Sequence, residues 1–281
     1  HPKISDIEER RKLRGAEHET EHIGTTGFHH VEFYCGDAKS TALRFALALG
    51  MKVTGTTGQH TGNDKCVSYR LESGDVRFLL TAPYSLAATA RSNNTASESP
   101  ELLDAPNPLP KFAQDEAHAF FAKHGLFARA IGVEVKDARK AFDESVARGA
   151  KPVLEPTCVP ACQGQEKDGF STCCYLAEVE LYGDVVLRYV SFPDGATSSR
   201  SPFLPHLAPV KGALAERPTF GLRRIDHAVG NVPDLLEALT RVSTFTGFHE
   251  FAEFTSEDVG TVDSGLNSVV LASDSEDVLL P

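Results

Sequence analysis

Apolar and polar positions repeat along this chain in three segments with the same layout, at 28–50, 130–149 and 225–247. Each segment opens with a short stretch in which apolar residues alternate with other residues. Alternation with a period of two predicts a strand with one buried face. Each stretch then reaches an aspartate, continues with apolar residues at helical spacing and ends at a glycine. The pattern therefore predicts an internal repeat of a strand followed by a helix.

The residues that bound the three predicted helices are of two kinds. An aspartate before a helix can accept a hydrogen bond from its free N–H groups. A glycine after a helix readily adopts the left-handed conformation that ends many helices. In the third segment the apolar residues of the helix share one face, as at Leu235, Leu239 and Val242. The aspartates are Asp37, Asp137 and Asp234, and the glycines are Gly50, Gly149 and Gly247.

Further strand-like runs follow each helix, so each repeat is predicted to be a β-α-β-β-(β) unit in an α+β fold. Two such units usually pair into a half-barrel sheet with the helices outside. Three units leave the third without its mate, and we expect that unit to expose apolar sheet. The runs lie at 66–71 and 76–80, at 173–182 and 185–192, and at 268–272 and 278–280.

Two stretches rich in proline, alanine and serine divide the chain, at about 85–110 and 193–218. The chain opens on His1, its only methionine is Met51, and it closes on the apolar run 278–281. We therefore expect the natural N-terminus to be absent or processed, and the sequence to stop inside a domain. The predicted organisation is an arm at 1–24, a structural domain at 25–195 with units at 25–85 and 124–193, a linker at 196–218 and a truncated domain at 219–281.

Composition narrows the class of protein. Hydrophobic residues make up 41% and charged residues 24%, which is typical of a globular protein. The net charge of -11 argues against nucleic acid as a partner. No run approaches the roughly 18 apolar residues that span a bilayer, so we expect no membrane partner. The six cysteines are too sparse for a disulfide scaffold, and the spacing of Cys158, Cys162, Cys173 and Cys174 matches no standard zinc motif.

A repeated unit of this kind with a histidine in its first strand resembles the vicinal-oxygen-chelate superfamily of metal-binding enzymes. Within it, the chain resembles the plant type of the 4-hydroxyphenylpyruvate dioxygenase family from about residue 25 to its end. The stretch at 158–170 fits least well. The matching strings are FHHVEFYCGDA (28–38), SGDVRFLLTAPYS (73–85), YGDVVLRYVS (182–191), RRIDHAVGNVP (223–233), FTGFHEFAEFT (245–255) and SGLNSVVLAS (264–273).

The resemblance implies a non-haem Fe(II) oxidoreductase of tyrosine and phenylalanine catabolism. Such an enzyme takes 4-hydroxyphenylpyruvate and O2, decarboxylates the side chain, hydroxylates the ring and moves the acetate arm to give homogentisate. Homogentisate also feeds plastoquinone and tocopherol synthesis. Two histidines and one carboxylate on one face of iron leave three positions free for substrate and oxygen. The resemblance further implies a homodimer. The composition, with few cysteines, suits the cytoplasm, and a plastid is the alternative compartment.

The resemblance assigns three site residues to this chain. His227, in the string Asp226-His227-Ala228, matches the family's first iron ligand. Val229 faces the same side as His227 if this stretch is a strand, and Ser268 matches a residue near the substrate. The structural alternative for His227 is a hydrogen-bonded core histidine, and that for Ser268 is an ordinary hydroxyl on a strand. The family's other histidine, its glutamate and its C-terminal helix belong to a fourth unit beyond residue 281, so we expect this chain to be inactive alone.

His30 occupies in the first unit the position that His227 has in the third. A second metal site would need a carboxylate on the last strand of unit two, but the sequence there contains Arg188. A cation would repel iron. We therefore interpret the N-terminal domain as a metal-free structural partner and His30 as a core histidine.

Other functions remain open from the sequence. The missing residues leave ring and side-chain hydroxylation undecided, so a related dioxygenase that uses the same 2-oxo acid is an alternative. An extradiol dioxygenase is a weaker one. A different class is a truncated, non-catalytic paralogue that binds a ligand or pairs with a full-length subunit.

Overall fold

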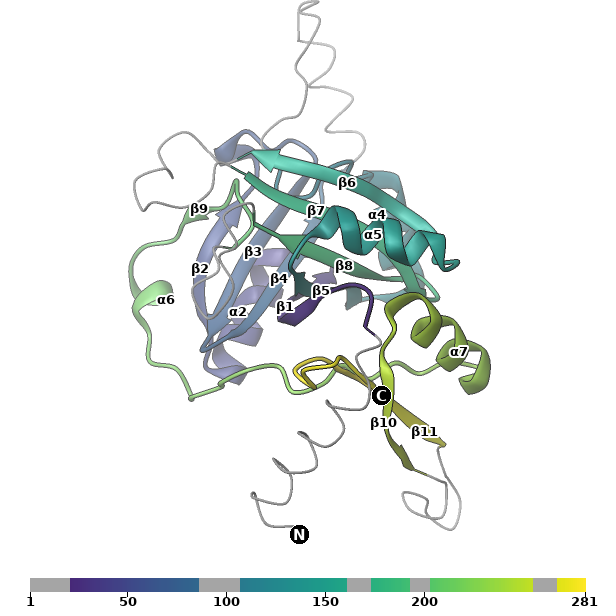
Figure 1. Ribbon diagram of the computed structural model, residues 1–281. Helices are drawn as coiled ribbons and strands as arrows, with labels where there is room; N and C mark the ends of the chain where they lie inside the picture. The colour runs from purple at the N-terminus through teal and green to yellow at the C-terminus, as the bar shows by residue number, and fades with distance from the viewer. Residues whose placement is uncertain (1–20, 86–106, 161–172, 193–202, 255–266) are drawn as a thin grey trace, which may run out of the picture.

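The computed structural model of the protein describes residues 21–85, 107–160, 173–192, 203–254 and 267–281. Their centre is a large curved sheet in the order β6-β7-β8-β5-β1-β4-β3-β2-β9, and a smaller sheet has the order β10-β11-β12. Helices α2 and α5 pack on one face of the large sheet, and α4 packs on its other face. Figure 1 shows the smaller sheet and α7 to one side of the large sheet. This arrangement confirms the predicted α+β class.

The elements follow one another as two similar units and a partial third one. The first unit has β1 (Thr25–Tyr34), α2 (Ala38–Leu49), β2 (Lys52–Thr57), β3 (Cys66–Ser73) and β4 (Val76–Pro83). The second has β5 (Phe127–Val135), α5 (Ala138–Ala147), β6 (Pro152–Pro160), β7 (Cys173–Tyr182) and β8 (Val185–Ser191). The third has α7 (Leu235–Thr246), β10 (His249–Phe254), β11 (Ser268–Ala272) and β12 (Leu279–Leu280). The short helix η1 (Gln59–Thr61) lies inside the first unit, between β2 and β3. Helix α4 (Gln114–His124) lies between the first and second units, and β9 (Ala208–Pro209) and α6 (Ala213–Glu216) lie between the second and third.

The first two units pair as the repeat predicts. In each unit the first strand runs parallel to the last, β1 beside β4 and β5 beside β8. The two first strands, β1 and β5, then pair antiparallel in the middle and join the halves into one sheet. Each first strand therefore has a partner on both edges: β1 lies between β4 and β5, and β5 lies between β8 and β1.

The predicted helix boundaries are confirmed at the aspartates. Asp37 accepts a hydrogen bond from Ser40 N at 3.0 Å, and Asp234 accepts one from Glu237 N at 2.9 Å. Asp137 accepts from two backbone N–H groups at the start of α5. The closing glycines of α2 and α7, Gly50 and Gly247, are left-handed with φ of 62° and 76°.

The predicted first strand of the third unit, at 225–232, is wrong in this structure. Residues 217–234 carry no strand, although Ala228 N donates to Leu279 O at 3.1 Å and Gly230 N donates to Pro281 O at 3.0 Å. The reason is the lack of neighbours: these two bonds join the stretch to β12 only, which is two residues long. Among the described residues, no strand pairs with its other edge, where β1 has β5.

The third unit packs against the large sheet through its apolar residues. Val242 and Phe245 of α7 belong to the same core cluster as Val133, Val179 and Leu181 of the large sheet. Arg241 also donates to the carbonyls of Glu180 and Leu181. The expectation of exposed apolar sheet is therefore wrong for β11, where Val269, Val270, Leu271 and Ala272 are all buried.

Several elements were not predicted. β2 and β6 directly follow their helices, and β6 begins and ends with proline at the edge of the sheet. α4 lies beyond the first polar stretch, and β9 lies inside the predicted linker, where it pairs with β2. The domain boundaries themselves stay a prediction. Across the described residues, no helix has the length and apolar character needed to cross a membrane.

Candidate functional site

His227 lies in the extended stretch that precedes α7 and is held there by its neighbours. The bonds from Ala228 and Gly230 to the last residues of the chain fix the backbone on both sides of Val229. The His227 side chain is 47% exposed, and its Nδ1 lies 2.9 Å from Oδ2 of Asp226. Asp226 is therefore placed to accept a hydrogen bond from Nδ1–H, which leaves the Nε2 lone pair of His227 directed away from the carboxylate.

The structure places the other two predicted site residues at different distances from His227. Val229 follows in the same extended stretch and is 61% exposed. Ser268 begins β11, which β12 separates from the His227 stretch. Leu279, which accepts the hydrogen bond from Ala228, pairs with Ala272 of β11. Ser268 lies four residues before Ala272, which is about 13 Å along the strand at about 3.3 Å per residue. The structure thus brings His227 and Val229 together but leaves Ser268 apart from them.

The described residues do not fit a complete iron site. No group of three or more His, Cys, Asp or Glu side chains among them is placed to hold a metal ion. A 2-His-1-carboxylate site needs three protein ligands on one face of the metal. His227 fits the part of one such ligand, because an accessible imidazole beside an orienting carboxylate is the usual arrangement of a metal-binding histidine.

The equivalent histidine in the first unit, His30, is buried, whereas His227 is exposed. His30 is completely buried, and its Nε2 lies 3.0 Å from a guanidinium nitrogen of Arg188. Arg188 also pairs with Glu178 at 2.6 Å and with Glu32 at 2.7 Å. Glu32 in turn accepts a 2.6 Å hydrogen bond from Thr81. We call these residues, His30, Glu32, Thr81, Glu178 and Arg188, the Arg188 cluster.

Arg188 determines the protonation of the histidines beside it. A guanidinium only donates, so Nε2 of His30 must accept and the proton of His30 must lie on Nδ1. That proton is then directed at Nδ1 of His29, 2.7 Å away. A register shift of β1 against β5 between Phe28 and His30 places the two adjacent rings next to each other. Burial, followed by the charges of His29 and Arg188, lowers the pKa of His30 well below its ordinary value.

Arg188 is the shared cation of the cluster and pairs with both of its carboxylates. Burial acts to lower the pKa of Arg188, but the adjacent carboxylates of Glu178 and Glu32 outweigh it, and the pKa is raised. Arg188 therefore stays a cation at the position where a metal site would need a carboxylate. His30 has its Nε2 occupied by this cation, which supports the interpretation of His30 as a core histidine.

Comparison with known sequences places the chain. It is 48% identical over 257 residues to "4-hydroxyphenylpyruvate dioxygenase" of Arabidopsis thaliana, covering 90% of this chain and 53% of the relative. It is 46% identical over 263 residues to the protein of that name from Daucus carota, with 93% and 53% covered. The resemblance to 4-hydroxyphenylpyruvate dioxygenase is confirmed. The chain spans about half the length of the curated relatives it matches. No protein-family model matches it.

Solved structures support the same fold. A mutant 4-hydroxymandelate synthase from Streptomyces coelicolor superposes with a TM-score of 0.64 at 16% identity, covering 92% of this chain and 62% of that one. A "xylose isomerase-like TIM barrel/4-hydroxyphenylpyruvate dioxygenase fusion protein" superposes with a TM-score of 0.57 at 19% identity, covering 93% and 33%. At these identities the likeness concerns the fold alone, and it agrees with the predicted vicinal-oxygen-chelate architecture.

The similarity to 4-hydroxyphenylpyruvate dioxygenase did not by itself reveal the partners of Arg188. Glu32 and Glu178 were not predicted, because they lie 156 and 10 residues away from Arg188 in the sequence. One signal was available in the sequence. Each glutamate stands inside a strand pattern between apolar residues, where a charge is tolerated only if it is paired.

Proposed function

We propose that this chain is part of a 4-hydroxyphenylpyruvate dioxygenase, in which His227 supplies one imidazole ligand to Fe(II). Iron, when bound, would supply the site at which the 2-oxo acid of the substrate and O2 meet. The substrates would be 4-hydroxyphenylpyruvate and O2, and the product homogentisate. The observation that carries the proposal is the identity of 43–48% to four plant enzymes of that name along nine-tenths of this chain.

The geometry of His227 supports its assigned role. Its exposure leaves Nε2 accessible to ligands from residues outside this chain, and Asp226 is positioned to hold the proton on Nδ1. Val229 lies beside it and would add an apolar wall to the substrate pocket, which limits the access of water to the reacting groups. We retain Ser268 as a substrate-pocket residue. The described residues bring only part of the site together, so this chain alone should be inactive.

A chimera tests the proposal. The part of the Arabidopsis thaliana relative that aligns with this chain is replaced by this chain, and the protein is loaded with Fe(II) under anaerobic conditions. Oxygen uptake and homogentisate are then measured with 4-hydroxyphenylpyruvate. We expect turnover by the chimera, no turnover by the 281-residue chain, and loss of turnover on His227→Ala. His60→Ala, at an exposed histidine on a surface turn, is the matched control and should keep the activity.

Two outcomes would contradict the proposal. Turnover by the chain alone would mean that iron is held by residues interpreted here as structural, or by a site shared between copies of the chain. A folded chimera that retains Fe(II) but makes a side-chain hydroxylated product would favour the related dioxygenases.

The second candidate function is a non-catalytic paralogue that binds a ligand or pairs with a complete subunit. The absence of a complete iron site among the described residues is the observation that favours it. A folded chimera that binds no iron and makes no product would support this candidate.

The proposed enzyme is a homodimer in the cytoplasm, with the plastid as the alternative compartment.

A further inference from the structure

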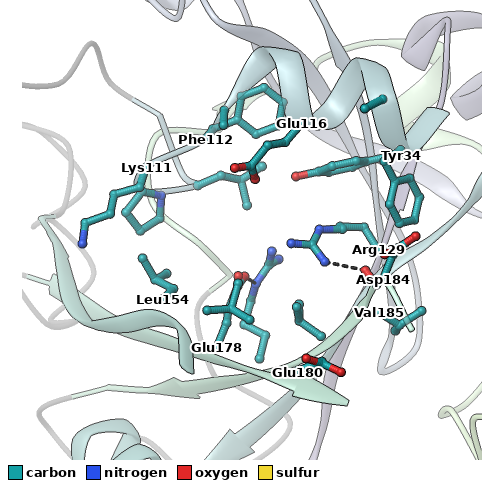
Figure 2. A pocket seen from close by; sticks show the side chains of 18 of the residues that line it. Tyr34, Lys111, Phe112, Glu116, Arg129, Leu154, Glu178, Glu180, Asp184 and Val185 are labelled. Carbon is teal, nitrogen blue, oxygen red and sulfur yellow. Dashed lines mark hydrogen bonds and ion pairs between the residues drawn. The ribbon is translucent and has the colours of Figure 1, made fainter. Parts of the chain in front are cut away.

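The N-terminal half of the fold contains a cavity that the proposed dioxygenase chemistry does not use. It has a volume of about 690 Å³, within the range of small-molecule sites, and it lies between α4 and strands β1, β5, β6, β7 and β8. None of His227, Val229 and Ser268 lines it. Figure 2 shows that side chains from α4 and from the sheet converge on one space. We call it the N-terminal cavity.

Its walls combine aromatic and aliphatic surface. The Tyr34 ring packs edge-on against Phe112, with ring centroids 5.8 Å apart, and against Phe120, with centroids 5.4 Å apart. Leu154 and Leu176 complete the apolar lining. Such walls suit a ligand with a flat apolar body.

Tyr34 presents an unpartnered hydroxyl to this space. The residue is 9% exposed, and within the described part of the chain its hydroxyl has no hydrogen-bond partner. In Figure 2 the Tyr34 oxygen points into the cavity. Burial, and then the charge of Glu32, raises the pKa of Tyr34, so the hydroxyl keeps its proton and can donate.

Arg129 of β5 presents unused donors to the same space. One of its guanidinium nitrogens donates to the carbonyl oxygen of Asp184 at 2.5 Å, and the guanidinium lies 5.9 Å from the ring centroid of Phe120. A guanidinium has five N–H donors, and Arg129 makes no ion pair with a carboxylate of the described residues. Its positive charge is therefore available to a ligand.

The other charges around the cavity are largely balanced. Glu178 pairs with Arg188, and Glu180 pairs with Lys151 at 3.3 Å. Asp184 pairs with Lys123 and His124 at 2.6 and 2.7 Å, and these bonds lower its pKa. Two exposed side chains of opposite charge, Lys111 and Glu116, remain at the rim. Within the described part of the chain, the Tyr34 hydroxyl thus lacks an acceptor, and Arg129 has N–H donors left over and no carboxylate partner.

We propose that the N-terminal cavity binds a small aromatic carboxylate, whose carboxylate accepts hydrogen bonds from Arg129 and the Tyr34 hydroxyl while its ring lies against Phe112 and Phe120. A neutral analogue of the same shape would satisfy the apolar walls but not the charge of Arg129. Lys111 lies at the rim in a left-handed conformation, with φ of 56°, which is uncommon for a residue other than glycine and is often seen at ligand sites.

The test titrates the folded 281-residue chain with benzoate, phenylacetate and 3-phenylpropionate, and with the amide of each. Calorimetry measures affinity, and nuclear magnetic resonance locates the perturbed residues. We expect at least one carboxylate to bind with a Kd of about 1 mM or tighter, and its amide to bind at least about tenfold more weakly. No saturable binding, or equal binding of acid and amide, would overturn the proposal.

Variants locate the site. Arg129→Gln should weaken binding at least about tenfold, and Tyr34→Phe about three- to tenfold, because each removes a donor to a charged group. Arg129→Lys keeps the charge and should recover part of the affinity. Arg139→Gln makes the same chemical change at an exposed arginine of α5 outside the cavity and should have no effect. Equal effects of Arg129→Gln and Arg139→Gln would overturn the proposal, whatever the outcome at His227, because none of these variants touches the iron-ligand region.

Discussion

His30 and His227 occupy equivalent positions in the first and third units, yet their surroundings are opposite. His30 is fully buried in the middle of the large sheet, where β5 lies on one side of β1 and β4 on the other. Its Nε2 is taken by Arg188. The His227 side chain is half-exposed, its stretch has β12 on one side, and its nearest charged partner is Asp226.

The difference shows that the neighbouring strands decide what a histidine in this position can do. In the first unit, β8 supplies Arg188 and β7 supplies Glu178, so the imidazole becomes part of a buried hydrogen-bond network. In the third unit no strand of the described residues supplies an equivalent cation. The ring nitrogen that Arg188 occupies in His30 is therefore free in His227 to accept a metal.

The largest effect is expected from removing the cation of the Arg188 cluster. Arg188→Met leaves Glu32 and Glu178 buried without a counter-charge, and should lower the free energy of unfolding by about 3–5 kcal/mol. Urea denaturation at neutral pH measures this. Adding Glu32→Gln and Glu178→Gln should recover part of the loss. A change below about 1 kcal/mol for Arg188→Met would show that the cluster is not the tightly packed unit described here.

A smaller effect is expected at Gly132, the β5 residue paired with His30. A Cβ there would lie 2.7 Å from His30 Nδ1 and 3.0 Å from the His30 carbonyl oxygen. Gly132→Ala should therefore cost about 1–3 kcal/mol through overpacking. Gly36→Ala is the matched control, because its Cβ would also meet an atom at 2.7 Å, but on the exposed ring of Phe121. Equal stability of the two variants by thermal unfolding would contradict the rigid placement of His30.

The depressed pKa of His30 predicts a pH dependence of stability. The unfolded chain takes up a proton at the ordinary histidine value of about 6.5, whereas the folded chain resists it. The stability from neutral His30 is thus fully present above about pH 6.5 and is lost below it, by at most about 1.4 kcal/mol per pH unit. His30→Gln should flatten the curve of unfolding free energy between about pH 7.5 and 5.5. An unchanged slope would contradict a neutral His30.

The smallest effect is expected in the third unit. Arg224 pairs with Asp226 at 3.2 Å, but both side chains are more than half exposed. Arg224→Gln should change the free energy of unfolding by about 0–0.5 kcal/mol, far less than Arg188→Met. A loss as large as that of the buried arginine, measured by the same urea denaturation, would show that the two regions do not differ as the structure indicates.

Much of the fold could be predicted from local residue patterns. The helices of the three units follow from an aspartate, an apolar face and a glycine, as at Asp37 and Gly50. β2 escaped prediction because it has little apolar alternation, and it forms by pairing between β3 and β9. β6 escaped because of its terminal prolines, which an edge strand tolerates since no N–H is needed there.

The site could be predicted only in part. The resemblance identified His227 as a ligand, and the sequence indicated that Arg188 excludes a second metal site. Both predictions were possible because each depends on a single residue and its position in the repeat. The partners of Arg188 come from strands that meet only in the folded sheet, so Glu32 could not be assigned to it in advance. The separation of Ser268 from His227 likewise depends on the register of β11 and β12.

The most direct test of the central claim is the iron content of the chimera under anaerobic conditions, with the two equivalent histidines changed in turn. His227→Ala should abolish the binding of one Fe(II) per subunit, and His30→Gln should leave it intact, because Nε2 of His30 is already occupied by Arg188. Retention of iron by His227→Ala, or its loss in a folded His30→Gln protein, would contradict the assignment of His227 as the metal ligand of this chain.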